Sequence, residues 1–186
     1  MKLHLGCCNR YLPGYVNIDI KGRTADVLAD IRKLPYDDAS IDEIYTSHVL
    51  EHFGRHEFLG VLQEWRRVLK PGSYIYIAVP NIESAIDYYN KTGNIHALYG
   101  QFWGGQRDEH DYHKFGYTFS TLSEYLKQVG FVDPELYNTF EYLPSGFDDY
   151  SKSYLPHMDF NGHHLSLNIR AHTPLQLSTP HYKNKQ

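Results

Sequence analysis

Lys2-Leu3-His4-Leu5-Gly6-Cys7-Cys8-Asn9 runs from a strand pattern into a turn of small residues. A second strand pattern, Tyr15-Val16-Asn17-Ile18, ends at the acid Asp19. A tight turn lets backbone N–H groups approach a ligand closely, and an acid after the second strand can accept both hydroxyls of a ribose. The stretch therefore predicts a nucleoside pocket at the ends of two neighbouring strands.

Three further motifs follow downstream in a fixed order. They are Leu28-Ala29-Asp30-Ile31 with the turn at 34–42, Tyr45-Thr46-Ser47-His48-Val49-Leu50-Glu51-His52, and Glu64-Trp65-Arg66-Arg67-Val68-Leu69-Lys70-Pro71-Gly72. As an ordered set the four motifs resemble class I S-adenosylmethionine (SAM) dependent methyltransferases. The resemblance covers residues 2–80 and 119–132. It is strongest to small, type-11-like members that are associated with polysaccharide modification.

Strand and helix patterns alternate along the chain, which predicts a mostly parallel α/β sheet covered on both faces. We expect strands at 2–5, 15–18, 27–29, 41–46, 74–79, 131–137 and 164–171, and helices at 56–69, 82–90 and 120–129, the last capped by Ser120. The resemblance implies a Rossmann-like, seven-stranded methyltransferase sheet whose last strand is antiparallel. The link at 6–14 is too short for the full helix that the family usually has there.

We expect one domain over residues 1–186. Its core would comprise 1–80 and 119–172, with insertions on the acceptor side at about 93–118 and 140–163. The net charge of −4 speaks against nucleic acid as a partner. There is no apolar run long enough to span a membrane and no signal-peptide pattern. The adjacent Cys7 and Cys8 suit neither a disulfide nor a zinc site, so we expect a reducing, cytoplasmic location. The sequence does not indicate an oligomeric state.

The resemblance implies that SAM lies across the carboxyl ends of the first, second and fourth strands. Gly6 and Cys7 would contact it through the backbone, Asp19 would bind the ribose, and Asp30 would mark the adenine edge. Two residues depart from the family pattern: His4 replaces an acid that helps to hold the methionine ammonium, and Cys8 replaces a glycine. The residues expected to bind the cofactor are His4, Gly6, Cys7, Asp19, Asp30, Ile31, Ser47 and His48.

Methyl transfer from a sulfonium to a hydroxyl requires in-line placement and often a base. The candidate catalytic residues are His113, His48 and Asp111. The seventeen tyrosines are either core and surface residues or a surface for sugar rings. We expect a small-molecule or glycan acceptor, with a sugar hydroxyl preferred. The candidate substrate-binding residues are His110, Tyr112, Asp148, Asp149, Tyr150 and His157.

Two other classes of protein remain open. A non-catalytic SAM-binding or scaffold protein would explain His4, Cys8 and the short first link. A zinc peptidase would use the H-x-x-E-H pattern of His48, Glu51 and His52, with both histidines on one face of a helix. Other histidines and acids at 110–113 show no diagnostic metal spacing, so a divalent ion is conceivable but not indicated.

Overall fold

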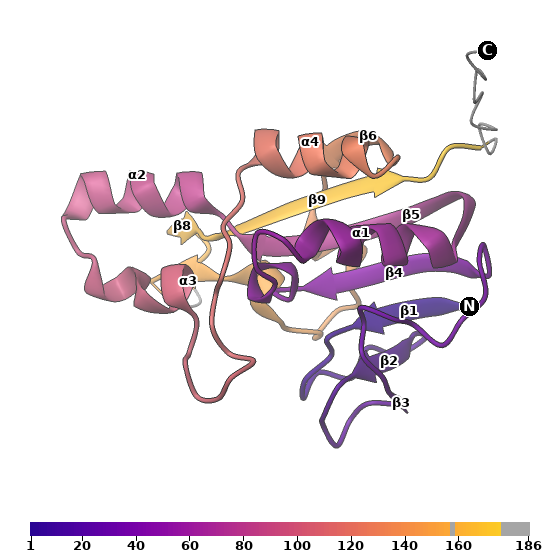
Figure 1. Ribbon diagram of the computed structural model, residues 1–186. Helices are drawn as coiled ribbons and strands as arrows, with labels where there is room; N and C mark the ends of the chain where they lie inside the picture. Colours follow the sequence, from indigo (N-terminus) through magenta and orange to yellow (C-terminus); the bar gives the residue numbers. More distant parts are fainter. Residues whose placement is uncertain (157–158, 176–186) are drawn as a thin grey trace, which may run out of the picture.

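A computed structural model describes residues 1–156 and 159–175 (Figure 1). One seven-stranded sheet has the strand order β3-β2-β1-β4-β5-β9-β6. Strands β1 to β5 are parallel to one another, and β9 is antiparallel to both β5 and β6. The predicted mixed, Rossmann-like sheet is therefore confirmed. The strand bounds are β1 Lys2–Leu5, β2 Val16–Asp19, β3 Val27–Leu28, β4 Ile41–Ser47, β5 Leu69–Pro80, β6 Val132–Leu136 and β9 Ser166–His172.

Helices and short turns connect these strands. The α-helices are α1 Phe58–Val68, α2 Ile82–Thr92, α3 Tyr99–Trp103, α4 Phe119–Gln128 and α5 Thr139–Tyr142. The 3-10 turns are η1 Leu50–His52, η2 His96–Leu98 and η3 Tyr150–Lys152, and a two-stranded ladder pairs β7 Tyr154–Leu155 with β8 His163–His164. In the part of the chain that the structure describes, no helix has the length and apolar character needed to cross a bilayer.

Helix α4 begins one residue earlier than the sequence predicted, and its cap lies two residues earlier. Thr118, not Ser120, is its cap: the Thr118 hydroxyl accepts a hydrogen bond from the N–H of Thr121, and the Thr121 hydroxyl accepts from the N–H of Thr118. This reciprocal pair satisfies two N–H groups that a helix start otherwise leaves unbonded. Thr118 has extended backbone angles, as an N-cap requires, whereas Ser120 already lies inside the helix.

One face of the sheet, here called the helical face, packs against α1 and α4. Phe58, Trp65 and Leu122 from these helices belong to one buried cluster with the aliphatic residues of the strands, such as Ile44 and Ile77. Trp65 is completely buried, and its indole N–H donates to the carbonyl of Ile31 at 3.1 Å. Figure 1 shows α1 lying along the sheet, with α4 beyond it over β9.

The opposite face is here called the tyrosine face. Tyr45 and Tyr76 alternate with isoleucines on β4 and β5, so their rings point away from the helices. The segment 137–153 covers this face through α5, η3 and the loop between them, and Tyr142 stacks on Tyr76 with ring centroids 3.9 Å apart. Helical elements thus lie on both faces, as predicted, but those on the tyrosine face are only single turns.

Candidate functional site

The turn that the sequence singled out follows the carboxyl end of β1 and lies beside the carboxyl end of β2. Gly6 has a φ of +69°, and a Cβ there would lie 2.2 Å from a methyl carbon of Val49. Only glycine tolerates both conditions. Cys8 takes a φ of +48°, so the position where the family has glycine does adopt the left-handed conformation. Both residues of the turn therefore have left-handed backbone angles, although one of them is a cysteine.

The N–H groups of this turn form hydrogen bonds within the protein. Those of Gly6 and Cys7 both donate to the carbonyl of Ile18, at 2.8 and 3.1 Å. They pair β1 with β2 instead of pointing outward, and the carbonyls of Cys7 and Cys8 accept from Arg10 and Thr24. Burial raises the pKa of the Cys7 thiol to about 11, so this side chain is an inert part of the packing.

Asp19 lies at the end of β2, where the ribose-binding acid was predicted. One carboxylate oxygen accepts from the N–H of Cys8 at 2.7 Å, and the other accepts from the N–H of Lys21 at 3.1 Å. These two bonds fix the orientation of the carboxylate. Because an ionised carboxylate has about four acceptor sites, each oxygen can still accept a hydrogen bond from a ribose hydroxyl. The geometry suits the predicted role of Asp19, which stays a prediction.

Asn17 is a supporting residue that the sequence did not single out. Its side chain is fully buried, its Oδ1 accepts from the N–H of Leu12, and its amide N–H group donates to the carboxylate of Asp26. Oδ1 also pairs with Nδ1 of His4 at 2.9 Å. An asparagine at the centre of a buried strand could have indicated this network, since a buried amide needs partners.

His4 faces the tyrosine face, packed among aromatic rings. Its ring lies 5.4 Å from that of Tyr45 and 6.0 Å from that of Phe147, and only 2% of the residue is exposed. Burial lowers the pKa of its imidazole. The structure thus gives His4 a part in holding the turn between β1 and β2, and direct contact with a cofactor stays a prediction.

Asp30 and Ile31 follow β3 and have different surroundings. Asp30 forms an ion pair with Arg32 at 2.7 Å, and the hydrogen bonds from this guanidinium lower the pKa of the carboxyl. Ile31 is buried on the helical face. Only Asp30 is therefore displayed at this strand end, and an adenine amine would have to compete with Arg32 for it.

Ser47 and His48 lie at the end of β4. The Ser47 hydroxyl oxygen is buried and has no hydrogen-bond partner among the residues that the structure describes. A buried orphan hydroxyl indicates a missing partner, and the methionine end of SAM is predicted to lie at this point. His48 has a φ of +54°, its Nε2 lies 3.1 Å from the hydroxyl of Ser166, and its ring lies 5.5 Å from that of Tyr150. Burial lowers the pKa of His48 to about 3, so the imidazole is neutral at physiological pH.

The loop 104–113 lies against the segment that follows the carboxyl end of β2. Asp108 accepts a hydrogen bond from the ammonium of Lys21 at 2.6 Å, which joins this loop to the segment that follows Asp19. Arg107 pairs with Asp111 at 2.6 Å and lowers the pKa of that carboxyl to about 2. Asp111 is therefore ionised but a poor proton acceptor. His110 and Tyr112 lie in this loop, partly or well exposed.

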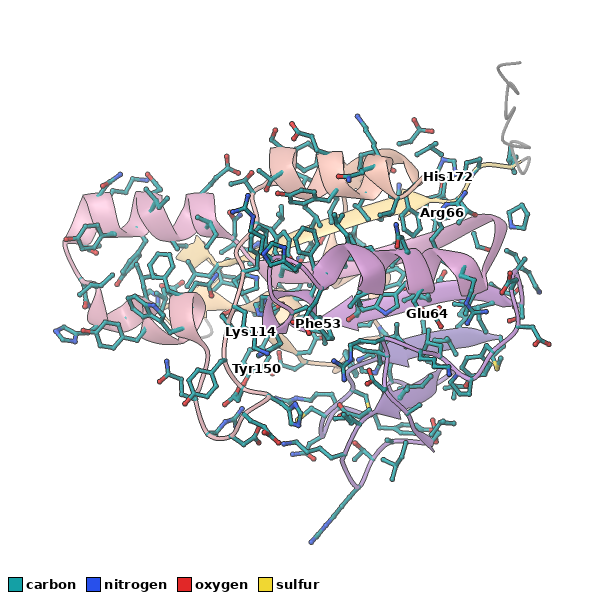
Figure 2. The ribbon with its side chains drawn as sticks, in the orientation of Figure 1. Phe53, Glu64, Arg66, Lys114, Tyr150 and His172 are labelled. Atoms are coloured by element: carbon teal, nitrogen blue, oxygen red, sulfur yellow. The ribbon has the colours of Figure 1, made fainter. Side chains whose placement is uncertain are left out.

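His113 closes the loop against η1. Its Nδ1 pairs with the carbonyl of Gln101 at 2.9 Å, while Nε2 lies 3.8 Å from a carboxylate oxygen of Glu51. The next residue, Lys114, donates its N–H to the carbonyl of Glu51. Figure 2 shows Lys114 beside Phe53, where this segment meets the end of η1, with Tyr150 just below.

The zinc-peptidase pattern does not form the helix that it requires. His48 precedes η1 in a left-handed backbone conformation, and η1 itself contains only Leu50–His52. His48 and His52 therefore do not occupy one face of a helix, and that hypothesis is wrong in its geometry. Glu51, the base of that pattern, is fully buried, and burial raises its pKa to about 8.

The segment 148–157 divides into different roles. Asp149 is buried, and its carboxylate accepts from the hydroxyl of Tyr45 at 2.6 Å and from the N–H of Ser151 at 2.9 Å. It holds η3 on the tyrosine face, which leaves it poorly placed to contact a substrate. Asp148 and Tyr150 are exposed. His157 lies outside the described residues.

Known proteins resemble this chain in sequence and in fold. Residues 13–77 match a family described as a methyltransferase domain. A SAM-dependent methyltransferase structure from Archaeoglobus fulgidus is 19% identical with a TM-score of 0.55, covering 92% of this chain and 85% of that one. One from Thermotoga maritima is 16% identical with a TM-score of 0.56, covering 92% and 81%. One from Methanosarcina mazei is 16% identical with a TM-score of 0.55, covering 94% and 92%. No curated protein matches the sequence.

The chain therefore has the fold of SAM-dependent methyltransferases, as its four motifs predicted, and residues 13–77 match a methyltransferase domain. SAM is the cofactor that this domain implies. The residues at the edge of the sheet fit it on three observations. Gly6 makes room beside Val49, Asp19 keeps acceptor capacity, and the buried hydroxyl of Ser47 has no partner among the described residues.

Proposed function

We propose that this methyltransferase transfers the methyl group of SAM to a hydroxyl oxygen of a small acceptor, preferably a sugar hydroxyl of a glycan. The observation that carries the proposal is the meeting of two segments at one edge of the sheet. The turn with Gly6 and Asp19 lies there, and the loop 104–113 reaches it through the Lys21–Asp108 ion pair. Cofactor-binding and acceptor-binding elements are thus neighbours, as group transfer requires.

When bound, SAM supplies an electrophilic methyl group. Asp19 would hold the ribose hydroxyls, the turn at Gly6 and Cys7 would line the cofactor, and Ser47 would donate its hydroxyl hydrogen to the methionine portion. The carboxylate of Asp19 is already oriented by two hydrogen bonds, and the buried hydroxyl of Ser47 has no partner among the described residues. Binding of this kind lowers the entropic cost of bringing the two reactants together.

His48 is our preferred proton acceptor among the three candidate bases because of its position; burial makes its imidazole a weak base, so this choice does not rest on basicity. It directly follows β4, where the reacting end of the cofactor is expected, and its neutral ring contacts the exposed Tyr150. The carboxylate of Asp111 is taken up by Arg107, and His113 is directed toward Glu51. We expect His48→Gln to lower kcat by about 100-fold or more, a larger effect than its effect on the Kd for SAM.

Exposed aromatic rings support a sugar acceptor. Tyr99 and Trp103 are each about half exposed, and together with residues 104–106 they line a hollow of about 390 Å³ beside the loop. The C–H faces of a sugar pack well on such rings. His110, Tyr112, Asp148 and Tyr150 supply the polar and aromatic groups that we assign to acceptor binding. Trp103→Ala should raise the KM for a sugar acceptor while leaving SAM binding intact.

The first test is calorimetric titration of SAM and S-adenosylhomocysteine into the purified protein. Because the ribose hydroxyls would lose their acceptor, Asp19→Ala should weaken the binding of SAM by about 10-fold or more. Asp37→Ala, an exposed acid in the turn before β4, is the matched control and should bind normally. Failure of the wild-type protein to bind at millimolar SAM, or equal binding by Asp19→Ala, would contradict the proposal.

The second test is transfer of a labelled methyl group to panels of sugars, phenols and amines. Labelling of sugar hydroxyls supports the proposal, whereas labelling of amines alone would overturn the assignment to oxygen. The internal use of the N–H groups of Gly6, Cys7 and Cys8 favours one alternative, a SAM-binding protein without turnover. That alternative predicts cofactor binding with no labelled product from any acceptor.

We further propose that residues 1–186 act as one domain in the cytoplasm. Cys7 and Cys8 are both free, Cys7 buried and Cys8 exposed, which suits a reducing compartment. Retention of SAM affinity by a fragment that ends before residue 119 would contradict the single domain.

A further inference from the structure

The carboxyl group of Glu51 stands out among the buried groups. Its residue is completely buried, and neither oxygen has a hydrogen-bond partner among the residues that the structure describes. Burying a carboxylate without a partner costs several kcal/mol or more, so such groups are neutral, paired or bound to a metal ion. A glutamate retained in this position therefore calls for a specific partner.

Histidines surround this carboxyl group. Oε1 of Glu51 lies 3.5 Å from Nδ1 of His48 and 3.8 Å from Nε2 of His113. The rings of His52 and His113 are 5.0 Å apart, edge to face. One donor atom from each of Glu51, His52 and His113 lies within 4.8 Å of the other two. The distances to Glu51 are too long for hydrogen bonds but close to the separation of two ligands on one ion, about 3.3 Å for tetrahedral zinc.

The other side of each ring is already held by the backbone. Nδ1 of His52 pairs with the carbonyl of Tyr112 at 3.1 Å, and Nδ1 of His113 pairs with the carbonyl of Gln101 at 2.9 Å. A carbonyl accepts only from N–H, so Nδ1 carries the hydrogen and Nε2 keeps its lone pair. Metal-binding histidines are oriented in this way in known sites, with the second nitrogen donating to a carbonyl or carboxylate.

We propose that Glu51, His52 and His113 form a binding site for a divalent transition-metal ion of the zinc class. Two imidazole nitrogens and one carboxylate oxygen suit zinc or ferrous iron better than calcium or magnesium, which prefer oxygen ligands. Water would complete the coordination, or His48 would do so through Nδ1. Because His113 ends the loop 104–113 and Glu51 belongs to η1, the ion would join these two segments. The proposal does not depend on methyl transfer.

The test is direct metal binding by the full chain, freed of metal with a chelator and then titrated with zinc or cobalt. We expect one equivalent to bind, with a visible cobalt spectrum typical of four or five ligands. Glu51→Gln and His113→Gln should each weaken metal binding by about 100-fold or more. Even residues that only hydrogen-bond to a metal ligand change metal affinity by about 10–100-fold. His56→Gln, which alters an exposed histidine close by in the sequence, is the matched control and should bind as the wild type does.

Circular dichroism shows whether each variant is folded, and His52→Gln replaces Glu51→Gln if the buried substitution does not fold. Zinc should also raise the Tm of the wild type and of His56→Gln but not that of the ligand variants. Two results would overturn the proposal. One is a folded wild-type protein without stoichiometric binding, in which case Glu51 is a neutral buried acid. The other is binding that the ligand variants leave unchanged, which would place the ion elsewhere among the twelve histidines.

Discussion

On the helical face of the sheet, long helices cover aliphatic side chains; on the tyrosine face, single turns and loops cover hydroxyl-bearing rings. The first face has its own apolar cluster around Trp65 and the isoleucines of β4 and β5. The second combines ring stacking with buried polar bonds, in which Tyr15 and Tyr142 both bond the carboxylate of Glu43. The helical face is held mainly by burial of apolar area, which is non-directional. The tyrosine face depends on hydrogen bonds, which position its elements.

This difference bears on the site. η3, which follows Asp149 and begins at Tyr150, lies on the tyrosine face and brings Tyr150 beside His48. Ser166, which bonds His48, also bonds Asn168 on β9. The tyrosine face thus positions Tyr150, one of the residues assigned to the acceptor, while the helical face supports the sheet from the other side.

The largest single effect should come from the helical face. Trp65→Ala removes a fully buried ring and its bond to Ile31, and should lower the free energy of unfolding by about 3–5 kcal/mol. Urea unfolding followed by circular dichroism measures the loss. Trp103→Ala, at a half-exposed ring, is the control and should change stability by less than about 1 kcal/mol. Equal losses at both tryptophans would remove the contrast between a packed face and an exposed ring.

The tyrosine face should instead make the free energy of unfolding depend on pH in the alkaline range. Burial raises the pKa of Tyr45, Tyr137 and Tyr142 above the ordinary value of about 10. The unfolded chain ionises first, so stability is intact below about pH 10 and falls above it. At about pH 11 each tyrosine should cost about 1.4 kcal/mol, or roughly 4 kcal/mol for the three. Urea unfolding at neutral and alkaline pH, with tyrosinate absorbance, checks this; if these tyrosines ionise normally in the folded protein, the prediction is wrong.

A single hydroxyl on the tyrosine face should have a smaller effect. Tyr45→Phe removes the donor to Asp149 without changing the ring, and should cost about 1.5–3 kcal/mol because a buried carboxylate loses a hydrogen bond. Tyr11→Phe, at a half-exposed ring, should be almost neutral. If Tyr45→Phe is equally neutral in urea unfolding, this face is held by ring packing and not by its polar bonds.

The smallest effect should appear at the edge between the faces. The Lys21–Asp108 pair is exposed, so Lys21→Met should leave the unfolding midpoint unchanged within error. The loop 104–113 should nevertheless exchange its amide hydrogens faster, because its ion pair with the segment that follows β2 is lost. Hydrogen exchange read by mass spectrometry tests this, with Lys91→Met on α2 as the control. An unchanged exchange rate would show that other contacts hold the loop.

Sequence patterns predicted the strands and the main helices well because the relevant signals are local. The apolar spacing in α1 and the strand–turn–strand pattern ending at Asp19 act over a few residues. The cap of α4 was misplaced because Thr118, Ser120 and Thr121 all carry capping hydroxyls, and only backbone angles distinguish them. The N–H groups of Gly6 and Cys7 bond β2 because the link between the strands is short, and contact of the cofactor with the backbone of these residues stays a prediction.

By itself the sequence determined the methyltransferase fold, since periodicity, turn residues and motif order do not depend on distant contacts. Only the tertiary structure decided what covers each face of the sheet and which groups Glu51 meets. Alternating Ile and Tyr on β4 and β5 predict two buried faces, but the cover of one returns from residues 137–153. Glu51 and His113 are far apart in the chain, and their proximity arises only when the loop 104–113 folds back on η1. Side chains from such distant segments acquire a shared chemistry only through the packing that brings them together.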